Sequence, residues 1–142
     1  MTWSPKQIVV VPVDFSDDSR LAVDTAIQLA AGPGSVHVVH VLPELAPSEP
    51  MVLWEAWESQ KRHKHAEDEL RKFLAGEQYL GLQLHVFVGD PGQEITALAE
   101  RLHAELIVLP SHGRTGLKRL LIGSVAERVV RLAHCPVLVL RK

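Results

Sequence analysis

Cysteine, long apolar runs and an export signal are the first features that the sequence lacks. Cys135 is the single cysteine, so no disulfide can form within the chain, as expected in a reducing cytosol. No apolar run reaches the roughly 18 residues that a membrane-spanning helix needs. The N-terminus also has no basic segment followed by a long apolar one. We therefore expect a soluble protein of the cytoplasm, without membrane insertion.

An excess of charge of either sign is also missing. The 15 basic and 17 acidic residues give a net charge of −2, which offers no positive surplus for binding nucleic acid. With 142 residues, the chain is expected to form one domain over residues 1–142. A domain of this size buries about 70% of its unfolded surface without disulfides or metals.

Several motifs of nucleotide and hydrolase chemistry are absent. There is no Gly-x4-Gly-Lys-Ser/Thr loop, no Gly-x-Gly-x-x-Gly after the first apolar run and no Gly-x-Ser-x-Gly elbow. A fast ATPase or kinase needs a positioned base and metal ligands, and Asp14 is the only visible candidate. The histidines are not spaced as metal ligands, because His37 and His40 should face opposite sides of a strand. No catalytic residue and no metal site are predicted.

What the sequence does contain is an alternation of β-branched and amphipathic segments. The expected strands are residues 7–13, 36–42, 82–88, 106–109 and 136–140, and the expected helices are 17–31, 51–75, one from 91, and 125–133. Ser16 and Asp90 are suited to cap the first and third helices. This alternation predicts an α/β fold with a parallel sheet, in which ligands bind beyond the carboxyl ends of the strands.

The segment 109–125 connects the fourth strand to the last helix and suits an anion. It holds three glycines (Gly113, Gly116, Gly123) and three basic residues (Arg114, Lys118, Arg119). Ser124 is predicted to cap the last helix, with Glu127 completing a capping box. Free N–H groups at a helix N-terminus, approached closely through glycine, favour phosphate. Asp14 follows the first strand, so it would face this segment if the first and fourth strands are neighbours.

These residues resemble the universal stress protein family over essentially the whole chain, from 8–16 (Ile-Val-Val-Val-Pro-Val-Asp-Phe-Ser) to 135–140 (Cys-Pro-Val-Leu-Val-Leu). The ATP-binding branch of that family carries Gly-x-x-Gly, nine residues, then Gly-Ser or Gly-Thr. Gly113 and Gly123-Ser124 match the later part of this pattern, and Pro110 stands where the first glycine would be. The resemblance implies a Rossmann-like, five-stranded parallel sheet of order 3-2-1-4-5, with helices on both faces.

The resemblance also implies ATP, with magnesium, as the ligand in a regulatory stress-response role. Asp14 would lie near the ribose or a metal-bridged phosphate, Val41 would line the adenine pocket, and backbone groups near Gly123 would hold phosphates. The full candidate nucleotide-binding set is Pro12, Val13, Asp14, Val41, Pro110, His112, Gly113, Arg114, Gly123, Ser124 and Val125. Enzymatic activity is not expected beyond slow ATP hydrolysis.

Two alternatives stay open. Proline has no N–H to offer a sugar oxygen, and losing such a contact at Pro110 would cost about 1–3 kcal/mol. That feature favours a dimeric scaffold of the same fold that acts through protein contacts without nucleotide. The other alternative is a slow ATP hydrolase in which His112 or Asp14 assists water.

Residues 137–140 are apolar and should form a sheet edge, which predicts a homodimer through that strand, as in the family's dimers.

Overall fold

All the strands of the computed structural model belong to one parallel sheet, in the order β3-β2-β1-β4-β5. The structure describes residues 4–44, 52–112 and 122–141, with side chains from residue 57 onward in the second segment. The elements are β1 (Val9–Pro12), α1 (Asp17–Leu29), β2 (Val36–Leu42), α2 (Val52–Phe73), β3 (Gln83–Val88), α3 (Pro91–Arg101), β4 (Leu106–Pro110), α4 (Ser124–Leu132) and β5 (Val137–Leu140). The predicted fold class and strand order are confirmed.

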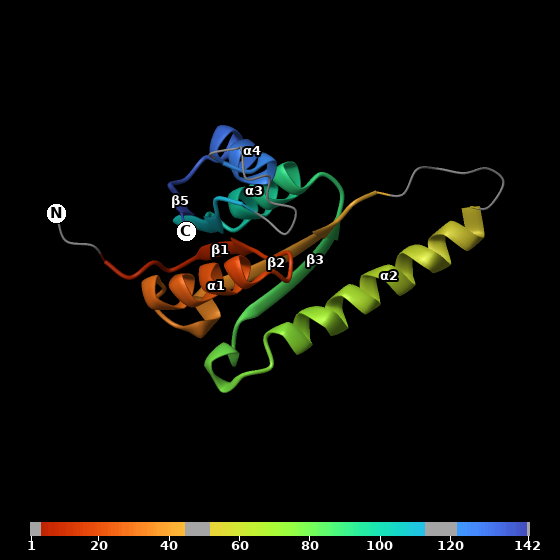
Figure 1. Cartoon of the computed structure of the whole chain (residues 1–142), viewed down its shortest axis with the longest axis horizontal. Helices are drawn as coiled ribbons and strands as arrows, with labels where there is room; N and C mark the ends of the chain where they lie inside the picture. The colour runs from red at the N-terminus through yellow and green to blue at the C-terminus, as the bar shows by residue number, and fades with distance from the viewer. Residues whose placement is uncertain (1–3, 45–51, 113–121, 142) are drawn as a thin grey trace.

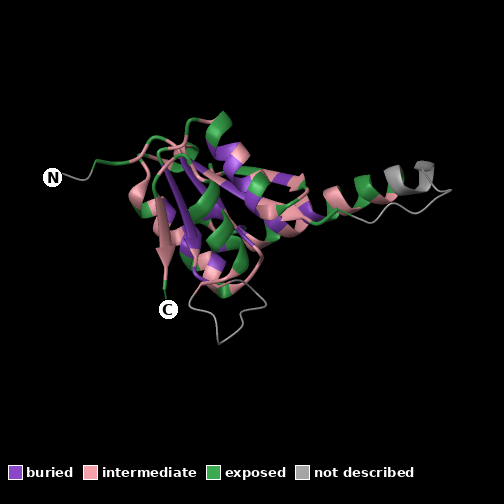
Figure 2. Ribbon diagram, turned by 90° about the horizontal axis from the view of Figure 1, so that it is seen from above, coloured by how far each residue is buried: buried purple, intermediate pink, exposed green. Residues whose placement is uncertain are grey.

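The strands alternate their side chains between two cores, one on each face of the sheet. Figure 2 shows the buried residues, in purple, running along the strands of the sheet. Val9 and Val11 of β1 pack with α1 and α2 through residues such as Leu70. Val10, between them, packs on the opposite face with Ile95 of α3 and with α4. Because both faces of β1 are covered, its valines are fully buried, as an unbroken β-branched run predicts.

Side-chain caps begin two of the helices where the sequence predicts them. The Oγ of Ser16 accepts a hydrogen bond of 3.1 Å from the Ser19 amide at the start of α1. Asp90 accepts one of 3.0 Å from the Gln93 amide at the start of α3. The end of α1 comes two residues earlier than predicted, because Ala30 leaves the helix to pair with Lys6 in an isolated bridge.

The start of α4 corrects one prediction. Ser124 does not cap this helix: it is the first helical residue, and Gly123 occupies the capping position without a side-chain bond. The Gly123 amide donates to the carbonyl of Ser111, and the Gly123 carbonyl accepts from the Glu127 amide at 2.9 Å. These two backbone bonds fix the first turn one residue earlier than the predicted capping box requires.

Helix α2 lies beside β3 and extends past the body of the molecule (Figure 1). Its inner face buries Ala66 and Leu70, while His63 reaches the edge strand and its Nε2 lies 2.9 Å from the Val86 carbonyl. Trp57, nearer the extended end, is 46% exposed, and the Lys61 ammonium lies over its ring. Among the described helices, none has both the length and the apolar character needed to cross a bilayer.

Candidate functional site

Backbone pairing between β1 and β4 stops before either strand ends. The register pairs Val9 with Leu106 and Val10 with Ile107, and it goes no further. On their other sides, β1 pairs with β2 up to Pro12, and β4 pairs with β5 up to Pro110. The carboxyl ends of β1 and β4 therefore each have only one paired neighbour in the described sheet. This is the point at which the strand order reverses, where parallel α/β sheets bind their ligands.

The two prolines explain why the pairing stops. Successive residues of a strand direct their backbone groups to opposite neighbours. The Val13 amide donates to Val39 of β2 at 2.9 Å, so Pro12 faces β4. The Ser111 amide donates to Leu140 of β5 at 2.8 Å, so Pro110 faces β1. Because proline has no N–H, two successive rungs between β1 and β4 cannot form.

A tight turn follows β1 and places Asp14. Its Oδ1 accepts hydrogen bonds from the Ser16 amide, at 3.0 Å, and from the Ser16 hydroxyl, at 2.5 Å. Phe15, between them, has a φ of 66°, which is uncommon for a residue with a side chain. The Asp14 carboxylate is thus fixed at the carboxyl end of β1, with one oxygen engaged in the turn.

Beyond β4, two backbone bonds join Ser111 to its surroundings. Its amide donates to β5, and its carbonyl accepts from Gly123, the capping residue of α4. These bonds bring the N-terminus of α4 to the carboxyl end of β4. The amides of Ser124, Val125 and Ala126 have no acceptor within the helix, because the first intrahelical bond is made by Glu127.

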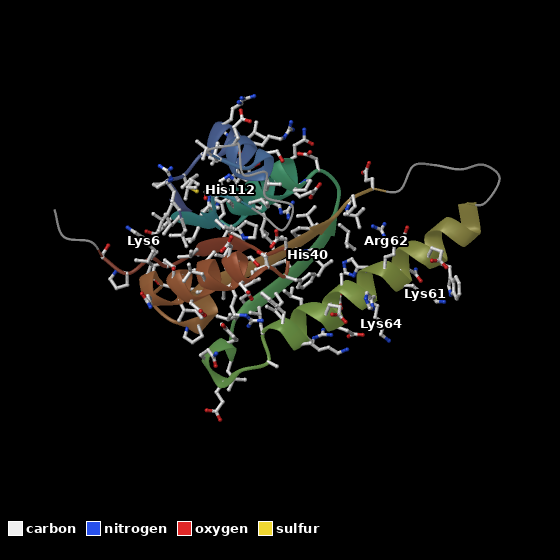
Figure 3. All side chains as sticks on the ribbon, viewed as in Figure 1. Lys6, His40, Lys61, Arg62, Lys64 and His112 are labelled. Carbon is white, nitrogen blue, oxygen red and sulfur yellow. The ribbon has the colours of Figure 1, made fainter. Side chains whose placement is uncertain are left out.

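The remaining predicted residues fall into two groups. Val41 is half-buried near the carboxyl end of β2, and the half-buried His112 has its Nδ1 3.2 Å from the Ser111 hydroxyl (Figure 3). Gly113 and Arg114 lie outside the described residues, as do Gly116, Lys118 and Arg119. The structure thus brings Pro12, Val13, Asp14, Pro110, His112 and Gly123 to the same edge of the sheet, together with Ser124, Val125 and Val41.

Three residues at this edge were not predicted from the sequence. Ser111 is buried and joins β4, β5 and α4, yet nothing in its neighbours signals this role. Phe15 adopts its positive φ without being glycine or asparagine, the residues that signal this conformation. His40, whose orientation away from His37 is confirmed, bonds to the Val13 carbonyl, a contact that requires the fold to be known.

The helix N-terminal amides at this end of the sheet are groups that can bind an anion. Helix N-terminal amides and a single carboxylate are suited to hold phosphates and a hydroxyl-bearing sugar. The part of the chain that the structure describes contains no group of three or more His, Cys, Asp or Glu residues able to hold a metal ion. Cys135 lies away from this edge, before β5, and burial raises the pKa of its thiol, which lowers its reactivity.

Comparison with known proteins gives matches along nearly the whole chain. A model of the universal stress protein family matches residues 6–141. The chain is 37% identical over 139 residues to universal stress protein MJ0531 of Methanocaldococcus jannaschii, covering 94% of this chain and 81% of that protein. The structure of MJ0577 superposes with a TM-score of 0.75 at 26% identity, covering 96% of both chains. A universal stress protein in complex with cAMP gives 0.60 at 28% identity, covering 97% and 98%.

Proposed function

The chain belongs to the universal stress protein family, and on this premise we propose that it binds ATP, with Mg²⁺, in a regulatory stress-response role. The proposed site is the edge where β1 and β4 end, with the triphosphate against the N-terminus of α4. The proposed place of action is the cytoplasm.

The observation that carries the proposal is that three features of a nucleotide site meet at the carboxyl ends of β1 and β4. The ladder between β1 and β4 ends at Val10 and Ile107, the α4 amides of Ser124 and Val125 begin beside β4, and Asp14 is fixed beside β1. A phosphate chain would accept from the helix amides, and the positive end of the helix dipole would favour its charge. Asp14 would accept from a ribose hydroxyl or face a phosphate-bound cation.

An adenine nucleotide is the ligand class that a relative supports. One solved neighbour is a universal stress protein in complex with cAMP, and it covers this chain almost completely. Val41 is half-buried near the carboxyl end of β2, and in the proposed complex it would contact a base held beside β1. We propose ATP rather than a cyclic nucleotide because Gly113 and Gly123-Ser124 have the spacing of the ATP-binding branch.

The residues fit Mg²⁺ only as a companion of the phosphates. One Asp14 oxygen is engaged by Ser16, and Mg²⁺ prefers several oxygen ligands in octahedral geometry. The chain offers few oxygen ligands, so the phosphates of the nucleotide would have to provide most of the coordination of Mg²⁺. Because the chain offers so few metal ligands, we propose that ATP hydrolysis is slow at most. His112 or Asp14 would be the residue that assists the attacking water.

Pro110 favours a second candidate function. It faces β1 and has no N–H, so it cannot donate to a sugar oxygen at the place where the family pattern has glycine. The alternative is a dimeric scaffold that pairs through β5 and acts through protein contacts. We propose that the protein is a homodimer in either case, because all four β5 residues are apolar and only partly buried.

Calorimetric titration with ATP and with AMP, each with and without Mg²⁺, tests the main proposal. We expect ATP binding that weakens without Mg²⁺ and that is abolished in Gly123→Val, whose side chain would stand at the N-terminus of α4. Gly32→Val is the matched control, since a Cβ at Gly32 meets nothing within 4 Å, and it should bind as the wild type does. No heat from wild-type protein at millimolar ATP would support the scaffold instead.

A further inference from the structure

His40 of β2 contacts the turn that carries Asp14. Its Nδ1 lies 2.8 Å from the carbonyl oxygen of Val13, and its ring centroid lies 4.5 Å from that of Phe15. Val13 and Phe15 flank Asp14 on both sides in the chain. The imidazole therefore contacts the residue before the carboxylate and the residue after it.

The Val13 contact fixes the hydrogen on the ring. A carbonyl oxygen only accepts hydrogen bonds, so the Nδ1 of His40 must carry the proton and donate it. The Val13 amide is held at the same time by the Val39 carbonyl at 2.9 Å. Both backbone groups of Val13 are thus bonded to successive residues of β2, and the chain leaves β1 in one direction.

The Phe15 contact supports an unfavourable backbone conformation. A φ of 66° costs roughly 1 kcal/mol or more for a residue with a bulky side chain, so the surroundings must stabilise it. Phe15 lies between the His40 ring and the ring of Phe73, whose centroid is 5.5 Å away in an edge-to-face arrangement. The guanidinium of Arg20 lies over the Phe73 ring, 4.0 Å from its centroid.

We propose that His40 is a positioning residue for the candidate nucleotide site. Its Nδ1–H and its ring hold Val13 and Phe15, and so keep the Asp14 carboxylate in the turn where Ser16 engages one of its oxygens. His40 acts through Asp14 and does not itself touch the nucleotide. This inference rests on the proposed function in so far as Asp14 belongs to the nucleotide site.

The first test needs no nucleotide. Long-range ¹H–¹⁵N spectra of the wild-type histidines should show His40 as the Nδ1–H tautomer, which is the less common one for a free imidazole. Hydrogen exchange should then report the turn, through the amides of Ser16 and Ser19, relative to the buried α4 residue Val129. In His40→Leu we expect these turn amides to exchange at least about tenfold faster relative to Val129.

A conservative variant separates positioning from packing. The amide nitrogen of asparagine occupies nearly the place of Nδ1, so His40→Asn should still donate to Val13. Because it lacks the ring that contacts Phe15, its turn amides should exchange faster than in wild type but clearly more slowly than in His40→Leu. An Nε2–H tautomer in the wild type would overturn the proposal. So would unchanged exchange in His40→Leu, or an asparagine variant that behaves as the leucine variant does.

ATP titration provides the second test. In otherwise wild-type protein, His40→Leu should weaken ATP binding about tenfold. In the Asp14→Ala variant, adding His40→Leu should weaken ATP binding by less than about twofold more. His37→Leu is the matched control on the same strand, since His37 faces the other side and pairs with His85, and it should bind normally. Additive losses would contradict action through Asp14. If wild-type protein binds no ATP while the tautomer and exchange results hold, the proposed function fails and the positioning role stands.

Discussion

Pro110 combines two effects at the level of a single residue. It removes a donor from the edge that faces β1, and it also removes a rung that would otherwise join β4 to β1. Pro110 would therefore weaken one contact of the proposed ligand, and it leaves the ends of β1 and β4 unpaired. Which effect dominates decides how the protein differs from relatives with glycine at this position.

Restoring the donor gives the first prediction. Pro110→Gly should tighten ATP binding about tenfold, equivalent to about 1.4 kcal/mol, because the new N–H faces the side where the ribose is proposed to lie. Calorimetric titration at one Mg²⁺ concentration measures the change. Pro110→Ala is the control for donor recovery with a side chain present. Equal or weaker binding by both variants would show that the N–H closes the ladder to β1 instead.

Residues whose roles depend on near neighbours were predictable, and those whose roles depend on distant ones were not. Ser16 and Asp90 cap helices through an amide three residues away, a pattern visible in any sequence. His40 contacts Val13, which is 27 residues distant in the chain, and the Ser111 carbonyl accepts from the Gly123 amide. The Ser124 capping box failed for the same reason, since the Ser111 carbonyl fixes the turn from outside the helix.

The helices α3 and α4 are closely packed at Gly92. This glycine lies in the first turn of α3, and a Cβ built there would stand 2.8 Å from the Cβ of Arg128 in α4. Arg128 also pairs with Asp90, the capping residue of α3, at 3.3 Å. The position of the α4 N-terminus, and with it the proposed phosphate site, therefore depends on the small size of Gly92.

Adding one methyl group tests this dependence. Gly92→Ala should lower the free energy of unfolding by ~1–3 kcal/mol, because two helix backbones must move apart to admit it. It should also weaken ATP binding. Gly34→Ala is the matched control, since its Cβ would meet nothing within 4 Å, and it should unfold at the wild-type urea midpoint. Equal midpoints for the two variants would show that α4 adjusts without cost.

The elements themselves were largely predictable because their signals are local and repeated. The strand Val36–Leu42 was predicted to the residue, and most other boundaries differ by one or two residues. The order of the strands came from the family resemblance, since alternation of strands and helices alone does not fix which strands are neighbours. The early end of α1 at Leu29 depends on Lys6, a residue outside both the helix and its strand.

The strands β2 and β3 are joined by a pair of histidines that was not predicted. The Nδ1 of His37 lies 3.0 Å from the Nε2 of His85, and the rings are stacked. Burial lowers the pKa of both imidazoles from the ordinary 6.5, and for His85 the nearby charges of His37 and Arg101 lower the pKa further. A neutral pair shares one proton across this contact, whereas two imidazolium rings would repel.

This pair predicts acid sensitivity. Since the folded pKa values lie below 6.5, the unfolded chain binds these protons first as the pH falls, and stability declines below about pH 6.5. The urea midpoint should therefore fall more between pH 7.5 and pH 5.5 in wild-type protein than in the double variant His37→Leu, His85→Leu. His134→Gln, which removes an exposed histidine, should keep the wild-type decline. If the urea midpoint of the double variant falls as much as that of the wild type, groups other than this histidine pair cause the acid sensitivity.

At the scale of the whole molecule, the two outer strands of the sheet, β3 and β5, differ in how their free sides are covered. Helix α2 lies alongside β3 (Figure 1), and His63 of α2 bonds to the outward carbonyl of Val86. At the β5 edge, Leu140 faces β4, as its bond to Ser111 shows, so Val137 and Val139 direct their backbone groups away from the sheet. The proposed homodimer would use these outward groups.

A single proline separates pairing from folding. Val139→Pro removes an outward N–H and leaves the bonds to β4 in place, so it should give a folded monomer by sedimentation velocity at micromolar concentration. Val139→Ala, which loses side chain but keeps the N–H, should remain a dimer. A proline variant that sediments as a dimer would place the interface elsewhere.

Because α2 and His63 lie against the β3 edge, association through the β5 edge would stop at two copies. Each copy has a single strand to offer, and a twofold pairing consumes both at once. In the proposed dimer a third copy would find no second free edge strand, so the continuous sheet would run through ten strands and stop. His63, bonded to the outward carbonyl of Val86, would then help to keep the assembly at two copies and out of a growing fibril.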